Sequence, residues 1–209
     1  MKHRNSRRSL IAFSLVVALV VALAALTARV SPARAGTIVQ LDGVKTTLTT
    51  DPGTTRALLR NLILPLPVGP TGTQLCLFCG PTVTYSFPIT GGAVDADTLA
   101  GQVEHSGGLR FFSLRTFRSL TLTGFTIEIG AHPDLTAEVN GDPQMRVAIL
   151  DLDLSSAQIV KSLPYVTVAN VGARLTAAAA AALNATLGTT LFQPGLKLGT
   201  ATVYARVAT

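Results

Sequence analysis

Few residues in this chain have side chains whose chemistry could support catalysis or ligand binding. Cys76 and Cys79 form the sole cysteine pair and are separated by two residues. Such a pair can form a local disulfide, act as a redox centre or supply half of a zinc site. A redox centre favours a helix N-terminus, whereas Gly80-Pro81 follows here, and zinc needs two further ligands. We expect a small structural disulfide and predict no metal site.

Two pairs of aspartates have a spacing that could serve acid and base catalysis. Asp95 with Asp97, and Asp151 with Asp153, are each two residues apart, which places both carboxylates on one face of a strand. The simpler interpretation is that Asp95 caps a turn over residues 96–99 and that the second pair lies on a solvated face. A hydrolase is kept as an alternative, but we assign no catalytic residue and expect a protein that is not an enzyme.

His105 lies in a segment where one strand is expected to turn into the next, because Ser106-Gly107-Gly108 follows it. A partly exposed histidine at the end of a hairpin is the simplest interpretation. A role as a ligand, or as the partner of a tyrosine, is the alternative.

Residues 1–35 have the layout of an export signal. Six of the 17 basic residues and none of the acidic ones lie here, around an apolar run from residue 10 to 28. Ala33 and Ala35 stand at the two positions that a signal peptidase reads. We predict cleavage after Ala35 by the general secretory route, although Arg7-Arg8 also resembles a twin-arginine signal. An uncleaved membrane anchor is the competing account.

The remaining residues, 36–209, are expected to form one β-rich domain. They hold eleven basic and eleven acidic residues, so the net charge of +6 belongs to the leader. Binding of nucleic acid, which needs uncompensated Lys and Arg, is therefore not expected. The protein would be exported, secreted or held in the cell envelope, and would meet the membrane only through an uncleaved leader.

Local patterns predict two short helices among many strands. Asp51-Pro52 precedes a helix over residues 54–61, and Thr176 and Gly188 bound a second over residues 176–187. The rest alternates between polar and apolar residues, with Gly124 as a bulge and Asn140-Gly141 as a two-residue hairpin turn. The alternating prolines of Leu64 to Pro70 restrict that segment to a sheet edge or a loop. We expect eight to eleven mostly antiparallel strands in a mainly β fold, either a β-sandwich or a curled sheet, preceded by the signal helix.

The segment from Phe87 to Val207 resembles the haem-transport-associated (Htaa) domain of actinobacterial envelope proteins. The likeness rests on five segments, namely Phe87-Pro88-Ile89-Thr90-Gly91-Gly92, residues 101–109, residues 120–129, Leu135-Thr136-Ala137-Glu138-Val139 and Leu175-Thr176-Ala177-Ala178-Ala179. The resemblance implies an exported, mostly antiparallel β domain that binds haem during iron acquisition.

The same resemblance implies a tyrosine ligand for the haem iron, supported by a histidine and placed just after an early helix that follows a Trp-Gly pair. This chain departs from that pattern, because it has no tryptophan and has Leu62 and Ile63 after its first predicted helix. A leucine cannot ligate ferric iron. Tyr85 with His105 is the substitute pair that we predict as the ligand-binding site.

Three hypotheses follow from the sequence. The first is a non-catalytic envelope domain that binds haem or another apolar ligand between sheet and helix, in a pocket with a tyrosine at its mouth. The second is a structural or adhesion module that meets an envelope partner protein through its surface. The third is the hydrolase with paired aspartates.

Overall fold

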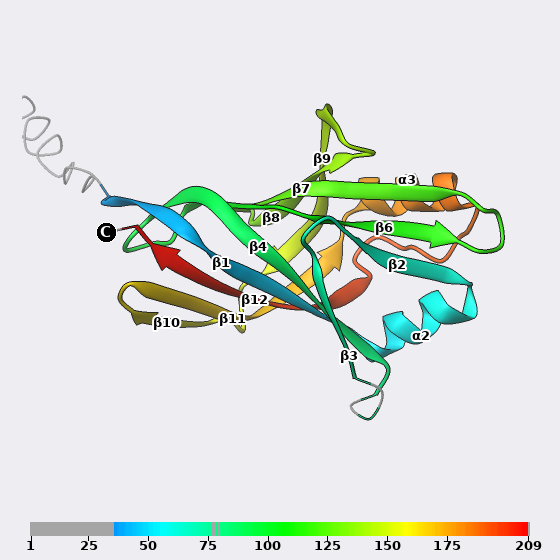
Figure 1. Ribbon diagram of the computed structural model, residues 1–209, viewed down its shortest axis with the longest axis horizontal. Helices are drawn as coiled ribbons and strands as arrows, with labels where there is room; N and C mark the ends of the chain where they lie inside the picture. The colour runs from blue at the N-terminus through cyan, green and yellow to red at the C-terminus, as the bar shows by residue number, and fades with distance from the viewer. Residues whose placement is uncertain (1–35, 77, 79, 209) are drawn as a thin grey trace, which may run out of the picture. The chain divides into compact units, whose positions relative to one another are not determined.

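The computed structural model describes residues 36–76, 78 and 80–208, so the predicted leader and Cys79 lie outside the described residues. Figure 1 shows a β-rich domain with two short helices at one end. The elements are β1 (Ile38–Thr50), α2 (Pro52–Arg60), β2 (Ile63–Val68), β3 (Gly72–Cys76), β4 (Thr82–Asp95), β5 (Gly101–His105), β6 (Gly108–Ser113), β7 (Ser119–Ile129), β8 (Asp134–Val139), β9 (Asp142–Asp153), β10 (Gln158–Ser162), β11 (Tyr165–Leu175), α3 (Ala177–Leu187) and β12 (Lys197–Val207). No helix in the described part of the chain is long and apolar enough to cross a membrane.

The sheet closes on itself into an eight-stranded barrel. All strand pairs are antiparallel, in the order β7-β5-β4-β1-β12-β11-β9-β8, and β8 pairs back onto β7. The mainly β class is confirmed, and of the two expected arrangements, a sandwich or a curled sheet, the structure has a sheet that curls until it closes. The count of eight to eleven strands was too low, since the described residues form twelve. Local alternation cannot distinguish these folds, because closure depends on the pairing of β7 with β8.

Bulges supply the curvature that lets the sheet close. The register shifts in β1 between Leu41 and Val44, in β4 between Ile89 and Gly91, and in β7 between Thr123 and Thr126. The predicted bulge at Gly124 is confirmed, with a φ of 56° that a glycine adopts without strain. Each bulge bends its strand and increases the local twist.

The chain does not form a hairpin after His105, which corrects the sequence interpretation. β5 and β6 both pair with β7, β5 along residues 126–129 and β6 along residues 119–123. They therefore run in succession along the same edge of β7, with Ser106 and Gly107 as a kink opposite Gly124. The kink leaves His105 inside the domain, where its side chain is buried.

The two predicted helices are present with the predicted caps. The Asp51 carboxylate accepts hydrogen bonds from the backbone N–H groups of Gly53 and Thr54 at the start of α2. Thr176 caps α3, and Gly188 ends it in the left-handed conformation. Leu183 and Leu187 of α3 are buried, and α3 packs against β7 and β9. In Figure 1 both helices lie at one end of the domain, and the β10 hairpin lies at the other.

Four strands lie off the ring. β6 pairs with β7, β2 extends the sheet beyond β6, β3 pairs with β4, and β10 pairs with β11. β2 is an edge strand, as its alternating prolines predict, because a proline cannot donate a ladder hydrogen bond. The turn at Asn140-Gly141 between β8 and β9 is also confirmed, with positive φ at both residues.

Two clusters of buried side chains fill the barrel. The first cluster, near the helices, contains Tyr85 and four phenylalanines, including an edge-to-face pair of Phe87 and Phe125 and another of Phe111 and Phe192. The second cluster is aliphatic throughout and consists of Leu41, Ile89, Val94, Val103, Ile127, Val203 and Ala205.

Candidate ligand cavity

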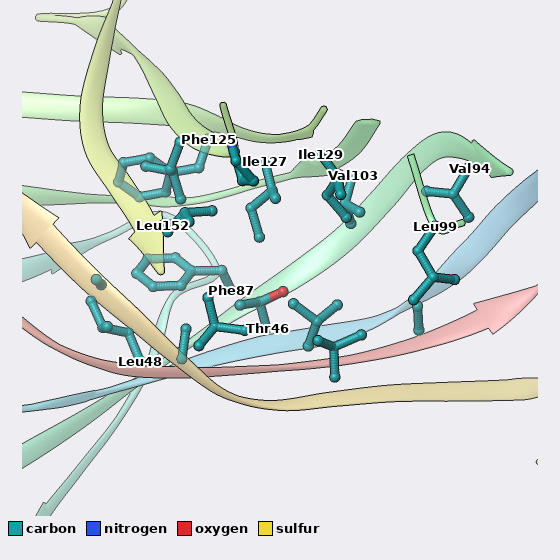
Figure 2. Close-up of a pocket in the computed structure, with 18 of the residues that line it drawn as sticks. Thr46, Leu48, Phe87, Val94, Leu99, Val103, Phe125, Ile127, Ile129 and Leu152 are labelled. Atoms are coloured by element: carbon teal, nitrogen blue, oxygen red, sulfur yellow. The ribbon is translucent and has the colours of Figure 1, made fainter. Parts of the chain in front are cut away.

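An apolar cavity of about 170 Å³ lies inside the barrel. Inward-facing side chains of both clusters line it, and Figure 2 places Phe87 and Phe125 at one end and Val94 and Leu99 at the other. Along β12 the lining residues are Leu198, Ala201, Val203, Ala205 and Val207. This position corrects the expectation of a pocket between sheet and helix. The alternation that directs polar side chains outward leaves the inside of the barrel apolar.

The cavity reaches solvent beside the β10 hairpin. Its inner lining is buried, with Val103 only 2% exposed, whereas Leu163 also lines it and is 82% exposed. Lys161, two residues before Leu163 in the same hairpin, is exposed and also belongs to the lining. A lysine therefore stands at the mouth of the cavity, where the sequence hypothesis expected a tyrosine.

Lys161 bridges the mouth. Its ammonium donates hydrogen bonds to the carbonyl oxygens of Ala96, at 2.7 Å, and Asp97, at 3.2 Å, in the loop between β4 and β5. Among the described residues no carboxylate forms a salt bridge with Lys161. An ammonium has three donors, so one donor remains for a further acceptor.

The Asp95 carboxylate holds this loop in shape. It accepts hydrogen bonds from the backbone N–H groups of Asp97 and Thr98 and from the Thr98 hydroxyl. The hydrogen bonds from Thr98 are the main reason that the pKa of Asp95 is lowered, and the charge of Lys161 adds to them. Asp95 therefore caps this turn, which is the interpretation that the sequence favours over a role in acid and base catalysis.

Tyr85 lies inside the domain but away from the cavity lining. Its hydroxyl donates a 2.8 Å hydrogen bond to the carbonyl oxygen of Pro65, which links β4 to the edge strand β2. Burial raises the pKa of the Tyr85 hydroxyl to about 12, so the phenol remains protonated at neutral pH.

His105 is held by two hydrogen bonds. Nε2 lies 2.7 Å from the hydroxyl of Thr46, whose side chain also lines the cavity, and Nδ1 lies 3.1 Å from the carbonyl oxygen of Phe125. Burial lowers the pKa of His105 to about 4, so the imidazole is neutral. Both of its nitrogens are occupied, and no hydrogen bond among the described residues joins His105 to Tyr85. The pairing of these two residues as a ligand site stays a prediction.

The second aspartate pair is exposed. Asp153 accepts a hydrogen bond from the backbone N–H of Ser155, and hydrogen bonds from Ser155 lower its pKa. Asp151 lies beside Asp134, whose pKa is raised by burial and then by the charges of Glu128 and Asp151. Within the described ranges no group of three or more histidines, cysteines or carboxylates could hold a metal ion.

The predicted disulfide cannot be followed to both of its ends. Cys76 closes β3, while Cys79 lies outside the described residues. The Cys76–Cys79 bond therefore stays a prediction.

Comparison with known proteins establishes the family of this chain. The model of the Htaa family matches residues 79–191, which is more than half of the sequence. The chain belongs to the Htaa family. No curated protein matches the sequence. The family assignment confirms the resemblance that the sequence motifs indicate.

Two solved structures from Corynebacterium glutamicum are similar to the domain. The C-terminal domain of HtaA is 13% identical with a TM-score of 0.58, and the match covers 81% of this chain and 99% of that one. The haem-binding protein HtaB is 11% identical with a TM-score of 0.49, covering 82% and 96%. At these identities the likeness to HtaA supports the fold alone.

Sequence reasoning predicted an apolar pocket but missed its position inside the barrel, and it missed Lys161. β10 has five exposed residues and no clear alternation of burial, so the hairpin that carries Lys161 had no predictive signal. The alternating valines of residues 166–168 and 203–207 were predicted as strands. The side chains on the inner faces of these two strands either pack in contact or leave a channel between them, depending on how the barrel closes. The sequence of a single strand does not determine this.

Proposed function

We propose that this Htaa-family chain is an exported, non-catalytic binding domain that takes an apolar ligand into the barrel cavity. In this proposal residues 1–35 are the leader, and residues 36–209 act as a single domain in the envelope or outside the cell. The observation that carries the proposal is the apolar cavity, which has its mouth beside Leu163. An eight-stranded barrel has room for either a filled core or one small ligand.

Haem is the ligand that the family suggests, and the residues around the cavity do not fit haem held through its iron. The described residues that line the cavity include no tyrosine, histidine, cysteine or methionine. The Tyr85 phenol is protonated and donates to Pro65, and both nitrogens of His105 are engaged. Leu62 and Ile63 follow α2, where the family pattern places its tyrosine. The described lining of the cavity therefore offers no side chain that could ligate haem iron.

A neutral fluorescent probe tests the proposal without involving charge. N-phenyl-1-naphthylamine should gain fluorescence when it enters the cavity of the purified protein. Ala205→Phe places a ring in the lining and should abolish the gain, whereas Thr202→Phe puts the same ring on the outer face of β12. Because overpacking costs about 1 to 3 kcal/mol, Val166→Phe, nearer the mouth, serves as a second blocking variant.

The outcomes separate the hypotheses. Loss of probe binding in both blocking variants, with retention in Thr202→Phe, supports the cavity. Equal binding by all variants, or none by the wild type, contradicts the proposal and favours a module that acts through its surface. A haemin Soret shift that disappears in Tyr85→Phe would contradict it in a different way, by assigning haem to Tyr85.

A further inference from the structure

We infer that the ligand of this cavity is a single unbranched aliphatic chain that ends in a carboxylate, with its head group at Lys161. The inference rests on the proposed function and adds the chemical class of the ligand. Three observations carry it, namely the shape of the cavity, the composition of its wall and the lysine at its mouth.

The cavity is long and narrow. Its lining along β12 runs from Leu198 to Val207, which is about 30 Å of strand at roughly 3.3 Å per residue. A volume of about 170 Å³ spread over that length describes a channel rather than a rounded chamber. A channel of this shape suits methylene groups in a single row.

The wall of the channel offers almost no polar partner. Apart from Lys161 at the mouth, the described part of the chain contributes one polar side chain to the wall. This is Thr46, whose hydroxyl is already bonded to His105. A ligand that placed hydroxyl or amide groups inside would lose its hydrogen bonds to water without replacement. The inner part of the ligand is therefore hydrocarbon.

The mouth provides one positive charge in a position to meet a ligand head group. Lys161 is fixed by the carbonyl oxygens of Ala96 and Asp97, which leaves its third donor for a ligand oxygen. The carboxylate of the nearby Asp95 is occupied by Thr98 and by the Asp97 N–H, so it does not neutralise Lys161 directly. A carboxylate bound here would form a charge-assisted hydrogen bond.

An exposed apolar residue beside Lys161 suits the part of the chain just below the head group. Leu163 is exposed yet lines the cavity. An aliphatic chain that leaves the channel here would cover this side chain. The inferred order, from inside outward, is hydrocarbon against Phe87 and Phe125, hydrocarbon against Leu163, and carboxylate on Lys161.

The test compares three ligands that share one ten-carbon chain and differ in the head group. Decanoate, decanol and decylamine each displace N-phenyl-1-naphthylamine from the purified protein, at concentrations below micelle formation. For the wild type we expect affinity to fall in the order decanoate, decanol, decylamine.

The variants test the role of Lys161. Lys161→Met should weaken the binding of decanoate about fivefold and leave the binding of decanol unchanged, since an exposed ion pair contributes modestly. Lys161→Glu should make decylamine bind better than decanoate. Lys45→Met, on an exposed lysine of β1, is the matched control and should change nothing.

Chain length gives a second measurement that does not depend on a variant. From hexanoate to decanoate, affinity should rise about fourfold per methylene while the channel fills, and the gain should end once it is full. A lysophospholipid with the same chain distinguishes a membrane lipid from a free acid, because its bulky head group would have to displace the bridge between Lys161 and the loop. The inference expects the free acid to bind more tightly.

Different results would overturn the carboxylate assignment and the binding cavity itself. If decanol and decanoate displace the probe equally, and Lys161→Met alters neither, the carboxylate assignment is overturned while the cavity remains a binding site. If the lysophospholipid binds more tightly than the free acid, the assignment to a free acid is overturned. If the wild type does not bind the neutral probe at all, the proposed function itself fails.

Discussion

Near the helices the inside of the barrel is filled by four phenylalanine rings and a tyrosine, whereas near the β10 hairpin it is lined by aliphatic side chains alone. The edge-to-face pairs of the first cluster include Phe87, Phe111 and Phe125, which line the cavity at its aromatic end. Aliphatic side chains of the second cluster reach less far into the lumen and line the rest of the channel. Side-chain volume, rather than the course of the backbone, therefore decides how much of the lumen is filled and how much can accept a ligand.

The largest predicted effect is a difference in the cost of truncating each cluster. Phe192→Ala removes a ring that is 1% exposed and packs against Phe111, and it should reduce the free energy of unfolding by about 3 to 5 kcal/mol. Val203→Ala, beside the existing channel, should cost only about 1 to 2 kcal/mol, because the cavity is already there. Urea unfolding of both variants measures the difference. Equal losses would mean that the two clusters are equally well packed.

The second prediction concerns pH and His105, which sits between the two clusters. Its pKa of about 4 in the folded protein lies below the ordinary value near 6.5, so the unfolded chain binds more protons between these values. Stability is therefore complete above about pH 6.5 and is lost as the pH falls toward 4. At pH 5 the loss should be roughly 2 kcal/mol.

Urea unfolding at pH 7 and pH 5 checks this prediction. His105→Gln should lower stability at pH 7 and flatten the pH dependence. His132→Gln, on an exposed histidine in the turn before β8, is the matched control and should retain the slope. A slope that survives in His105→Gln would show that another group controls acid stability.

The smallest predicted effect concerns the contact between β4 and the edge strand β2, next to the first cluster. Tyr85→Phe removes one hydrogen bond, to the Pro65 carbonyl, and should cost about 1 kcal/mol without changing probe binding. Tyr204→Phe, on an exposed tyrosine of β12, should leave stability within about 0.5 kcal/mol of the wild type. If Tyr85→Phe instead abolished ligand binding, the sequence prediction of Tyr85 as a ligand residue would be supported and the cavity account weakened.

Local features of the fold could be predicted from the sequence because their physical causes are local. The caps at Asp51 and Thr176, the bulge at Gly124, the turn at Asn140-Gly141 and the edge strand with its prolines each depend on a few neighbouring residues. The closed barrel depends on the pairing of β7 with β8 on one side and with both β5 and β6 on the other. That pairing leaves no local signature, which is why the sequence left a sandwich and a curled sheet as alternatives.

The candidate site was harder to predict for the same reason. His105 precedes two glycines and therefore suggested an exposed turn, but the glycines form a kink within a continuous edge, and the imidazole is buried. Lys161 lies in a strand whose residues are all exposed, so nothing in its neighbourhood indicates a binding role. Its position at the cavity mouth follows from the contact with Ala96, which is 65 residues away in the chain.

A crystal structure of the protein with decanoate would show directly whether the lumen of the barrel is a binding channel. The account predicts hydrocarbon density inside the barrel along Ala205 and Val103, with the carboxylate within hydrogen-bond distance of the Lys161 ammonium. A lumen closed by side chains, with decanoate bound only on the outer surface or at Tyr85, would contradict it.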